Sequence, residues 1–130
     1  MALFLLIGLL GTMSMAPTAT AKSRGDCPQY HDILKKYGLP PKVFGPIAWR
    51  ESRCNPKSVS AIRQSTGRPD VGLLQIQGSW SSLTMRLCHV KRSQVVKALT
   101  RLECQLTVAS YLWADGKGAA NWSIRSGSHG

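Results

Sequence analysis

Four cysteines constrain the fold of this 130-residue chain more than any other feature of its sequence. They are Cys27, Cys54, Cys88 and Cys104. An even number of cysteines in a small exported domain predicts two disulfides, and four cysteines can pair in three ways. The sequence has no C-x-x-C motif, and its three histidines are scattered. Both observations argue against a zinc site, so we expect disulfides and no metal.

The N-terminal residues indicate export. The apolar run "ALFLLIGLL" is followed by small and polar residues and then by "ATA", which ends at Ala21. This order is typical of a secretory signal peptide that is cleaved after Ala21, and the run is too short to cross a bilayer. We therefore expect a signal peptide at residues 1–21 and one domain at residues 22–130. The mature protein is expected outside the cell, in the cell wall or in the periplasm, without stable membrane insertion.

The charge of the chain is strongly positive. It has 17 Lys and Arg against 6 Asp and Glu, a net charge of +11, and residues 1–21 carry no charge. Such a balance favours a polyanionic partner, which can be a cell wall, a nucleic acid or an anionic lipid surface. No RNP, zinc-finger or basic-zipper pattern is present, so we expect no nucleic-acid partner and no cofactor.

The first half of the domain shows two helical segments. The apolar spacing predicts a helix over Tyr30–Tyr37, with Gly38 at its end. A second helix is expected to begin near Pro46, because a proline in the first turn of a helix costs no hydrogen bond. This helix runs through "IAWRESRC" and ends before Asn55-Pro56, because the residue before proline avoids the α region.

The second half combines an extended segment with further helices. Residues 55–69 are rich in Ser, Gly, Arg and Pro and read as a loop, whereas "DVGLLQIQ" predicts a short strand or a strand-like turn. Helices are expected around Trp80–Leu87 and along the apolar stripe from Leu102 to Trp113, which ends at Asp115-Gly116. The fold class is therefore mainly α (α+β), with a small extended segment.

Glu51 is one of six acidic residues and lies between two arginines. Ile47 precedes it by four positions, so the two share a helix face. If Ile47 points into the core, Glu51 lies at the core edge or in a cleft, where a carboxylate is costly unless it is paired or protonated. The alternative is that Glu51 turns outward and pairs with Arg50 or Arg53.

Two motifs resemble a known family. The segments "RESRCNP" and "DVGLLQI", with Ser60 between them and Trp80 after them, resemble the lysozyme-like superfamily of muramidases and lytic transglycosylases. These enzymes share a helix that ends in Glu-Ser, a following Asn-Pro and a "GLMQI"-like segment. The likeness spans Cys27 to Trp122. It implies a small lysozyme-like domain with the extended segment beside a catalytic cleft, and peptidoglycan glycan strands as the partner.

The resemblance also implies roles for five residues. Glu51 takes the position of the catalytic acid. Ser60 matches a serine that lies beside the sugar, and Gln75 matches a glutamine that lines the glycan cleft. Asp70 matches an aspartate of C-type lysozymes and of some transglycosylases, and Trp122, in "DGKGAANW", matches the tryptophan that walls the acid. Two alternatives stay open, because Asp70 could cap its own loop and Gln75 could tie down loop backbone.

The chemistry of glycosidic cleavage fits these placements. The departing oxygen needs a proton, so a carboxylic acid must hold one near neutral pH. An aromatic wall favours the protonated form because it excludes water. We therefore expect Glu51 in a low-dielectric cleft, with the flanking arginines projecting away from it.

Three functions fit this reading. The favoured one is a lytic transglycosylase, in which the 6-hydroxyl of the sugar attacks and the product carries a 1,6-anhydro ring. The first alternative is a lysozyme-type hydrolase of the same bond, in which Asp70 assists Glu51. The second is a cationic wall-binding module without catalysis. Where many transglycosylases carry "AYN", this chain has "AANW", which leaves Tyr111 or Trp122 in place of the usual tyrosine.

The resemblance bears on the cysteine pairing too, because Cys88 and Cys104 resemble a cysteine pair of C-type lysozymes. We expect Cys27–Cys54 and Cys88–Cys104. The first bond would join the start of one helix to the end of the next, which suits antiparallel neighbours. Each would stabilise the domain by about 2–4 kcal/mol. The protein is expected to be a monomer.

Overall fold

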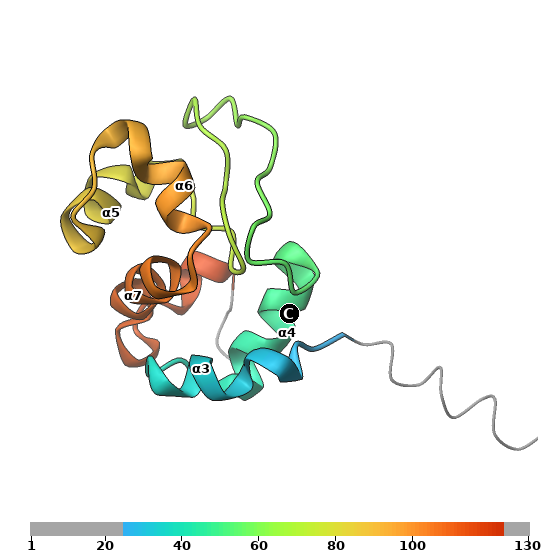
Figure 1. Cartoon of the computed structure of the whole chain (residues 1–130). Coiled ribbons are helices and arrows are strands. Elements are labelled where there is room, and N and C mark those ends of the chain that lie inside the picture. Colours follow the sequence, from blue (N-terminus) through green and yellow to red (C-terminus); the bar gives the residue numbers. More distant parts are fainter. Residues whose placement is uncertain (1–24, 124–130) are drawn as a thin grey trace, which may run out of the picture.

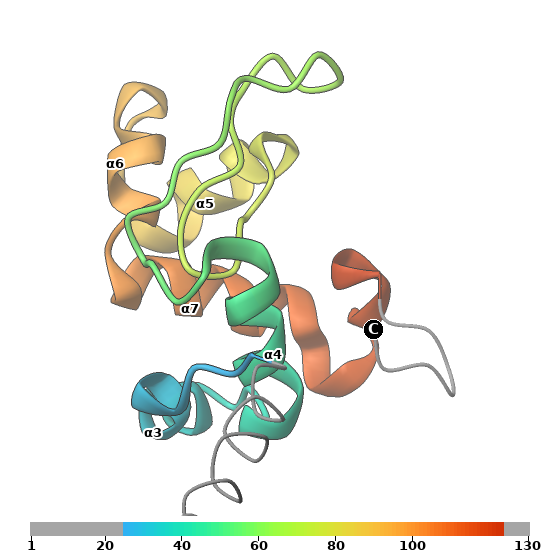
Figure 2. The same ribbon diagram turned by 90° about the vertical axis from the view of Figure 1, so that its right-hand side faces the viewer.

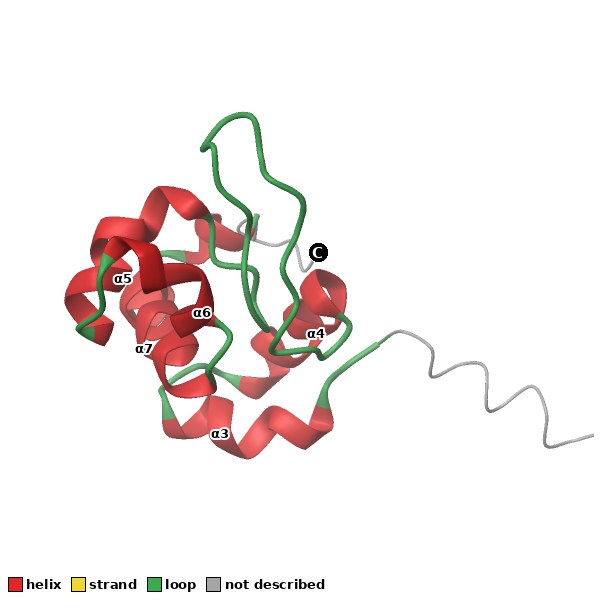
Figure 3. Ribbon diagram, turned by 45° about the horizontal axis from the view of Figure 1, so that its top comes forward, coloured by secondary structure: helices red, strands yellow, loops and turns green. Residues whose placement is uncertain are grey.

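A computed structural model describes residues 25–123, and the predicted signal peptide lies outside this range. The α-helices are α3 (His31–Lys36), α4 (Pro41–Ser52), α5 (Ser81–Cys88), α6 (Val95–Leu99) and α7 (Leu102–Trp113). Short 3-10 helices are η2 (Pro28–Tyr30), η3 (Gly78–Trp80), η4 (Arg92–Gln94), η5 (Ala114–Gly116) and η6 (Ala119–Trp122). Figure 3 shows these helices joined by loops. The described residues are mainly helical, which confirms the predicted class and is consistent with a lysozyme-like fold.

The end of α3 follows the predicted signal. Gly38 has a φ of +75°, a conformation that side chains rarely adopt. Its N–H bonds the Lys35 carbonyl at 3.0 Å, and the N–H of Leu39 bonds the Leu34 carbonyl at 3.0 Å. This pair of bonds is a Schellman motif, which satisfies the last carbonyls of the helix. Leu34 and Leu39 are both fully buried, so the turn also starts the core.

The start of α4 differs from the prediction. The helix begins at Pro41, after Pro40 at the N-cap, and Pro46 lies inside it. The expectation that Pro46 occupies the first turn is therefore wrong. Pro41 already fills the first position, where a missing N–H costs nothing. Pro46 leaves the carbonyl of Lys42 without its helical partner, but both residues are exposed and water can reach this oxygen.

A long hairpin-like excursion follows α4. Ser60 and Asp70 pair through their backbones at 2.9 Å, and the ribbon rises above the helices in Figures 1 and 2. Its base is Val71, which bridges Val59 on one side and Ile76 on the other. Residues 71–76 are thus a tight turn rather than a regular strand, one of the two forms expected. We call them the buried turn, because Val71 and Ile76 are 1% and 2% exposed.

One side chain of α7 holds the buried turn in place. Gln105 is 1% exposed, and its Oε1 accepts the N–H of Leu74 at 2.8 Å. Its Nε2 donates to the carbonyls of Val71 at 3.1 Å and Leu99 at 2.8 Å. Gly72, with a φ of +92°, lies so close that a Cβ there would overlap the Gln105 amide. With Gln105 in place, the turn therefore requires a glycine at position 72.

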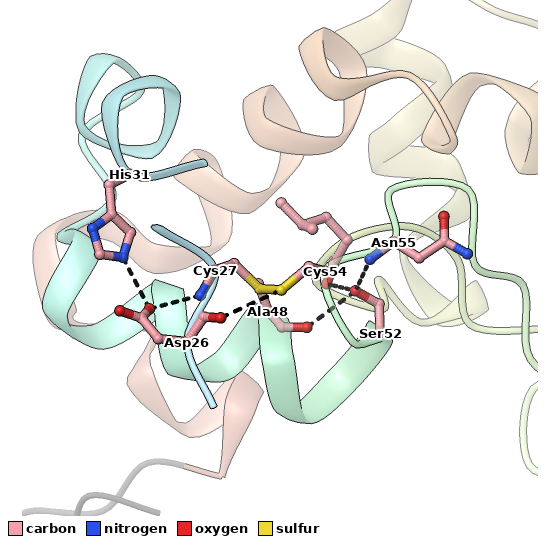
Figure 4. The surroundings of a disulfide bond; sticks show 8 residues. Asp26, Cys27, His31, Ala48, Ser52, Cys54 and Asn55 are labelled. Atoms are coloured by element: carbon pink, nitrogen blue, oxygen red, sulfur yellow. Dashed lines mark hydrogen bonds and ion pairs between the residues drawn. A yellow bond between two sulfur atoms is a disulfide. The ribbon is translucent and has the colours of Figure 1, made fainter. Parts of the chain in front are cut away.

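Two disulfides fasten the helices. Cys27 is bonded to Cys54, and Cys88 is bonded to Cys104, the pairing expected. Figure 4 shows the first bond between the segment before η2 and the residues after α4. Asp26 beside it accepts the N–H of Cys27 at 2.8 Å and lies 2.9 Å from His31. The second bond joins the end of α5 to the start of α7, so these two helices are fixed side by side.

Three aromatic rings close the core next to the C-terminal helices. Phe44 of α4 is fully buried and makes edge-to-face contacts with Trp113 and Trp122, at ring-centroid distances of 4.9 and 5.0 Å. Such contacts add to the burial of apolar surface. Trp113 therefore belongs with the core, as expected from its place on the α7 stripe. The contacts tie η6 to α4, the helix that carries Glu51.

Replacing Gln105 with Leu should lower the free energy of unfolding by about 2–4 kcal/mol, because it leaves the buried N–H of Leu74 and carbonyl of Leu99 without a partner and removes one of the two bonds to the Val71 carbonyl. Chemical denaturation of the oxidised protein measures this change. Gln29→Leu, at an exposed position of η2, is the matched control and should be near neutral. Equal stability of the Gln105 variant and the control would show that the buried turn does not depend on these bonds.

Candidate active site

Glu51 lies in the last turn of α4, one residue before the helix ends. Its side chain is 29% exposed, whereas Ile47 on the same helix face is 4% exposed. The helix thus places the carboxylate at the edge of the core. This is the position that the spacing of the two residues predicts.

Arg50 does not project away from Glu51, and this expectation is wrong. The Oε2 atom of Glu51 accepts from Arg50 Nε at 3.1 Å and from Arg50 Nη2 at 2.8 Å. A half-buried carboxylate loses part of its hydration, and the adjacent guanidinium compensates for that loss. The pairing stated as the alternative is therefore found for Arg50. Arg53 instead lies over the Trp49 ring, 4.7 Å from its centroid.

Ser52 connects the end of α4 to the buried turn. Its hydroxyl is buried and lies 2.8 Å from the carbonyl of Leu73 and 3.0 Å from that of Ala48. It also accepts the N–H of Asn55 at 3.1 Å. The residue next to Glu51 is therefore bonded to the turn, which fixes the acid relative to residues 71–76.

The side chain of Gln75 is hydrogen-bonded to nearby backbone carbonyls. Its Nε2 donates to the carbonyls of Ser58 at 3.2 Å and Gly72 at 3.0 Å. Gln75 is half-buried and has a φ of +53°. The geometry thus shows the second of the two roles considered for it, the tying of loop backbone. A glycan contact at Gln75 stays a prediction.

Trp122 lies near the acid through its backbone. Its ring is 5% exposed, and its Nε1 donates to the Leu74 carbonyl at 3.2 Å. Its own carbonyl accepts from Arg50 Nη2 at 2.9 Å. Gln75, Trp80 and Trp122 line one hollow of about 10 Å³, which suits a single water rather than a sugar. Gln75 and Trp122 therefore line the same small hollow, and their contact with a glycan stays a prediction.

Asp70 and Ser60 are brought together at the base of the hairpin. The Ser60 hydroxyl accepts the N–H of Asp70 at 2.8 Å and donates to the Ala61 carbonyl at 2.7 Å. The Asp70 side chain is 14% exposed, and its Oδ2 accepts from Arg63 at 3.2 Å. Its Oδ1 is buried and has no hydrogen-bond partner among the described residues. Both side chains make hydrogen bonds within the hairpin. Their roles in catalysis and sugar binding stay predictions.

Two residues that shape the site were missed in the sequence. Arg50 was expected to point away, and nothing near it in the chain indicates its bond to Trp122. Gln105 had a usable signal, because it lies three residues after Leu102 and so on the apolar face of α7. A polar residue on such a face indicates a buried hydrogen-bonding role. Tyr111, named as a substitute for the family tyrosine, is 57% exposed.

Two classes of feature are not found within residues 25–123. No three His, Cys, Asp or Glu side chains gather there in a way that could hold a metal ion. In the same range no helix has the length and apolar character needed to cross a membrane.

Comparison with known proteins gives one match. Residues 30–100, more than half of the chain, match the family described as "Transglycosylase SLT domain". The chain belongs to the transglycosylase SLT domain family. No curated protein and no solved structure shows a significant match. Membership supports an activity of the peptidoglycan lytic transglycosylase type and implies peptidoglycan as the substrate.

The matched range of the SLT domain runs from η2 to the end of α6. It includes Glu51, Ser60, Asp70 and Gln75 and stops before Trp122. It also stops before α7, whose Gln105 fixes the buried turn. The role of Trp122 therefore rests on the resemblance of its segment and on its contacts with the matched part.

Replacing Ser60 with Ala should lower the free energy of unfolding by about 1 kcal/mol, because the N–H of Asp70 loses its acceptor. Ser65→Ala, at the exposed tip of the hairpin, should be neutral. Thermal unfolding and pelleting with purified cell walls measure stability and binding in the same preparations. Weaker wall binding at unchanged stability would mean that Ser60 contacts the sugar and does not support the hairpin.

Proposed function

We propose that the domain is a lytic transglycosylase that cleaves the β-1,4 bond between N-acetylmuramic acid and N-acetylglucosamine and releases 1,6-anhydro products. The observation that carries the proposal is the placement of Glu51. Its half-buried carboxylate lies in the last turn of α4, and its neighbour Ser52 is bonded to the buried turn. Membership of the SLT domain family supports the same reaction class.

One carboxyl group can perform both proton transfers of this reaction. Protonated Glu51 donates its proton to the glycosidic oxygen as the bond to the anomeric carbon breaks. The resulting carboxylate then takes the proton of the sugar's own 6-hydroxyl while that oxygen bonds the anomeric carbon. The sugar gains no water, and Glu51 ends the cycle protonated. Among residues 25–123 no hydrogen bond engages Oε1, so this oxygen serves the substrate.

The hydrolase alternative needs Asp70 as a second carboxylate. Its unpartnered Oδ1 favours such a role, because a buried oxygen without a hydrogen bond is costly and calls for a function. Against it stand the burial of the side chain and its bond to Arg63. The transglycosylase reaction requires only one carboxyl group, that of Glu51, whose Oε1 has no hydrogen-bond partner among residues 25–123, and we therefore prefer it.

Peptidoglycan lies outside the cytoplasmic membrane, and this supports export of the protein. In this proposal residues 1–21 are the cleaved signal peptide, and residues 22–130 are the catalytic domain. The two disulfides agree with an oxidising compartment.

Replacing Glu51 with Gln should reduce the clearing of purified cell walls at least about 100-fold while wall binding is kept, because only the proton donor is lost. Glu103→Gln, which changes the other glutamate of the chain, is the matched control and should clear walls normally. Mass spectrometry of the released muropeptides identifies the reaction, since an anhydro product is one water lighter than a hydrolysed one.

Hydrolysed products alone would replace the proposal with the lysozyme-type reaction. Undiminished clearing by the Glu51 variant would reject Glu51 as the acid. Wall binding by the wild-type protein without any released product would identify a binding module instead.

A further inference from the structure

We propose that Arg50 is a positioning residue that holds the carboxylate of Glu51 in its reactive orientation. This inference rests on the proposed function. The guanidinium of Arg50 is hydrogen-bonded to residues of two elements, α4 and η6. Arg50 contacts Glu51 Oε2 through Nε at 3.1 Å and through Nη2 at 2.8 Å. The same Nη2 donates to the Trp122 carbonyl at 2.9 Å.

This geometry restricts how the acid can turn. Two nitrogens of a planar guanidinium hold the same oxygen, Oε2, so rotation of the carboxylate would break both bonds. The other oxygen, Oε1, is left for the substrate. Arg50 in turn is held by the Trp122 carbonyl, and the ring of Trp122 is bonded to the buried turn through Leu74. Arg50 thus links the acid to Trp122 of η6, which lies 72 positions after Arg50 in the chain.

Arg53 provides an internal comparison. It lies three residues after Arg50, and its charge rests over the Trp49 ring instead of the acid. Removing either arginine changes the net charge by the same amount. Only the loss of Arg50 should release Glu51 Oε2.

The test measures kcat and KM on a soluble, short peptidoglycan glycan for Arg50→Met, Arg50→Lys and Arg53→Met, together with thermal unfolding. Because small misplacements of a reacting group cost up to about 100-fold in rate, we expect Arg50→Met to lower kcat about 10- to 100-fold. KM should stay within about twofold. Arg50→Lys keeps the charge but cannot bridge both partners, so its kcat should lie between those of wild type and Arg50→Met. Arg53→Met should match wild type.

Wild-type kcat in a folded Arg50→Lys or Arg50→Met variant overturns the inference. A loss confined to KM, or an equal loss in Arg53→Met, overturns it as well. These results differ from failure of the proposed function, in which the wild-type protein itself would cleave no glycan.

We infer, from an independent observation, that the lobe formed by α5, η4 and α6 is the surface that binds the anionic wall. Residues 71–102 contain no acidic residue. The same span carries Arg86, Lys91, Arg92, Lys97 and Arg101. All five are exposed. We call the part of this span from Ser81 to Leu99 the basic lobe.

Two arginines at the candidate site, unlike the cations of the basic lobe, are ion-paired. Arg50 is paired with Glu51, and Arg63 is paired with Asp70. Within residues 25–123, which hold all six acids of the chain, no cation of the basic lobe has an ion-pair partner. The helices of the lobe pack on one another, and Figures 1 and 2 place α5 and α6 on the side of the molecule away from α3. Among the described residues, the basic lobe therefore carries unpaired cations with no acidic residue in its own segment, whereas the unpaired Lys35, Lys36 and Lys42 share α3 and α4 with Asp32 and Glu51.

The partner that we propose for the basic lobe is peptidoglycan, which bears carboxylates on its stem peptides. Exposed Lys and Arg without partners attract a dense array of carboxylates through many weak contacts, and salt screens this attraction. This inference also rests on the proposed function, because it takes the substrate of Glu51 as the partner of the lobe.

The test compares two triple variants of equal charge. Lys91, Arg92 and Lys97 of the basic lobe are changed to Gln in one, and Lys35, Lys36 and Lys42 of α3 and α4 in the other. Pelleting with sacculi freed of phosphate polymers is measured from low to physiological salt. We expect the lobe variant to lose at least about tenfold in affinity at low salt, with a shallower salt dependence. The control should lose less than about twofold, and both should cleave the soluble glycan normally.

An equal loss in both variants would show a diffuse charge effect and overturn the inference. So would a loss for anionic vesicles or DNA that leaves binding to sacculi intact. Failure of the proposed function is distinguishable, because it would appear as absent cleavage by all forms, with the binding comparison still measurable.

Discussion

The amide of Gln105 is the interaction on which the rest of the site depends. A backbone turn inside a core has no water to satisfy its polar groups, so another part of the protein must supply donors and acceptors. Gln105 supplies both kinds, accepting from Leu74 and donating to Val71 and Leu99. An apolar residue could fill the same space but would leave the N–H of Leu74 and the carbonyl of Leu99 unpaired. The turn is therefore fixed by α7, although family recognition ends before that helix.

Fixing the turn places the acid. The carbonyls of Leu73 and Leu74 are each hydrogen-bonded by a different element. Ser52 at the end of α4 reaches the first, and the indole of Trp122 in η6 reaches the second. Glu51 is the residue before Ser52, so its position follows from bonds made by its neighbours. This arrangement leaves the carboxylate free of structural duties other than its pair with Arg50.

Features set by nearby residues could be predicted from the sequence, and features set by distant ones could not. The end of α3 before Gly38 and the end of α7 at Trp113 could be predicted, because the residues that end each helix lie within one turn of its last residue. Pro46 was misplaced because the stronger start signal of Pro41 precedes it. The bond from Arg50 to Trp122 spans 72 positions, and the bond from Gln105 to Leu74 spans 31. Such partners are chosen by packing, which periodicity does not encode.

In the proposed function, the charged residues of the catalytic site and those that attach the protein to the wall lie in different parts of the fold. At physiological ionic strength charges in water are screened over about 8 Å, so the basic lobe acts on what touches it. The ion pairs of Glu51 with Arg50 and of Asp70 with Arg63 cancel the charges of these four residues. In the proposed function these paired charges would add little to the attraction of cleaved anionic strands. In the proposed function the unpaired cations of the basic lobe would hold the protein on the wall between cleavages, so attachment and product release would not conflict.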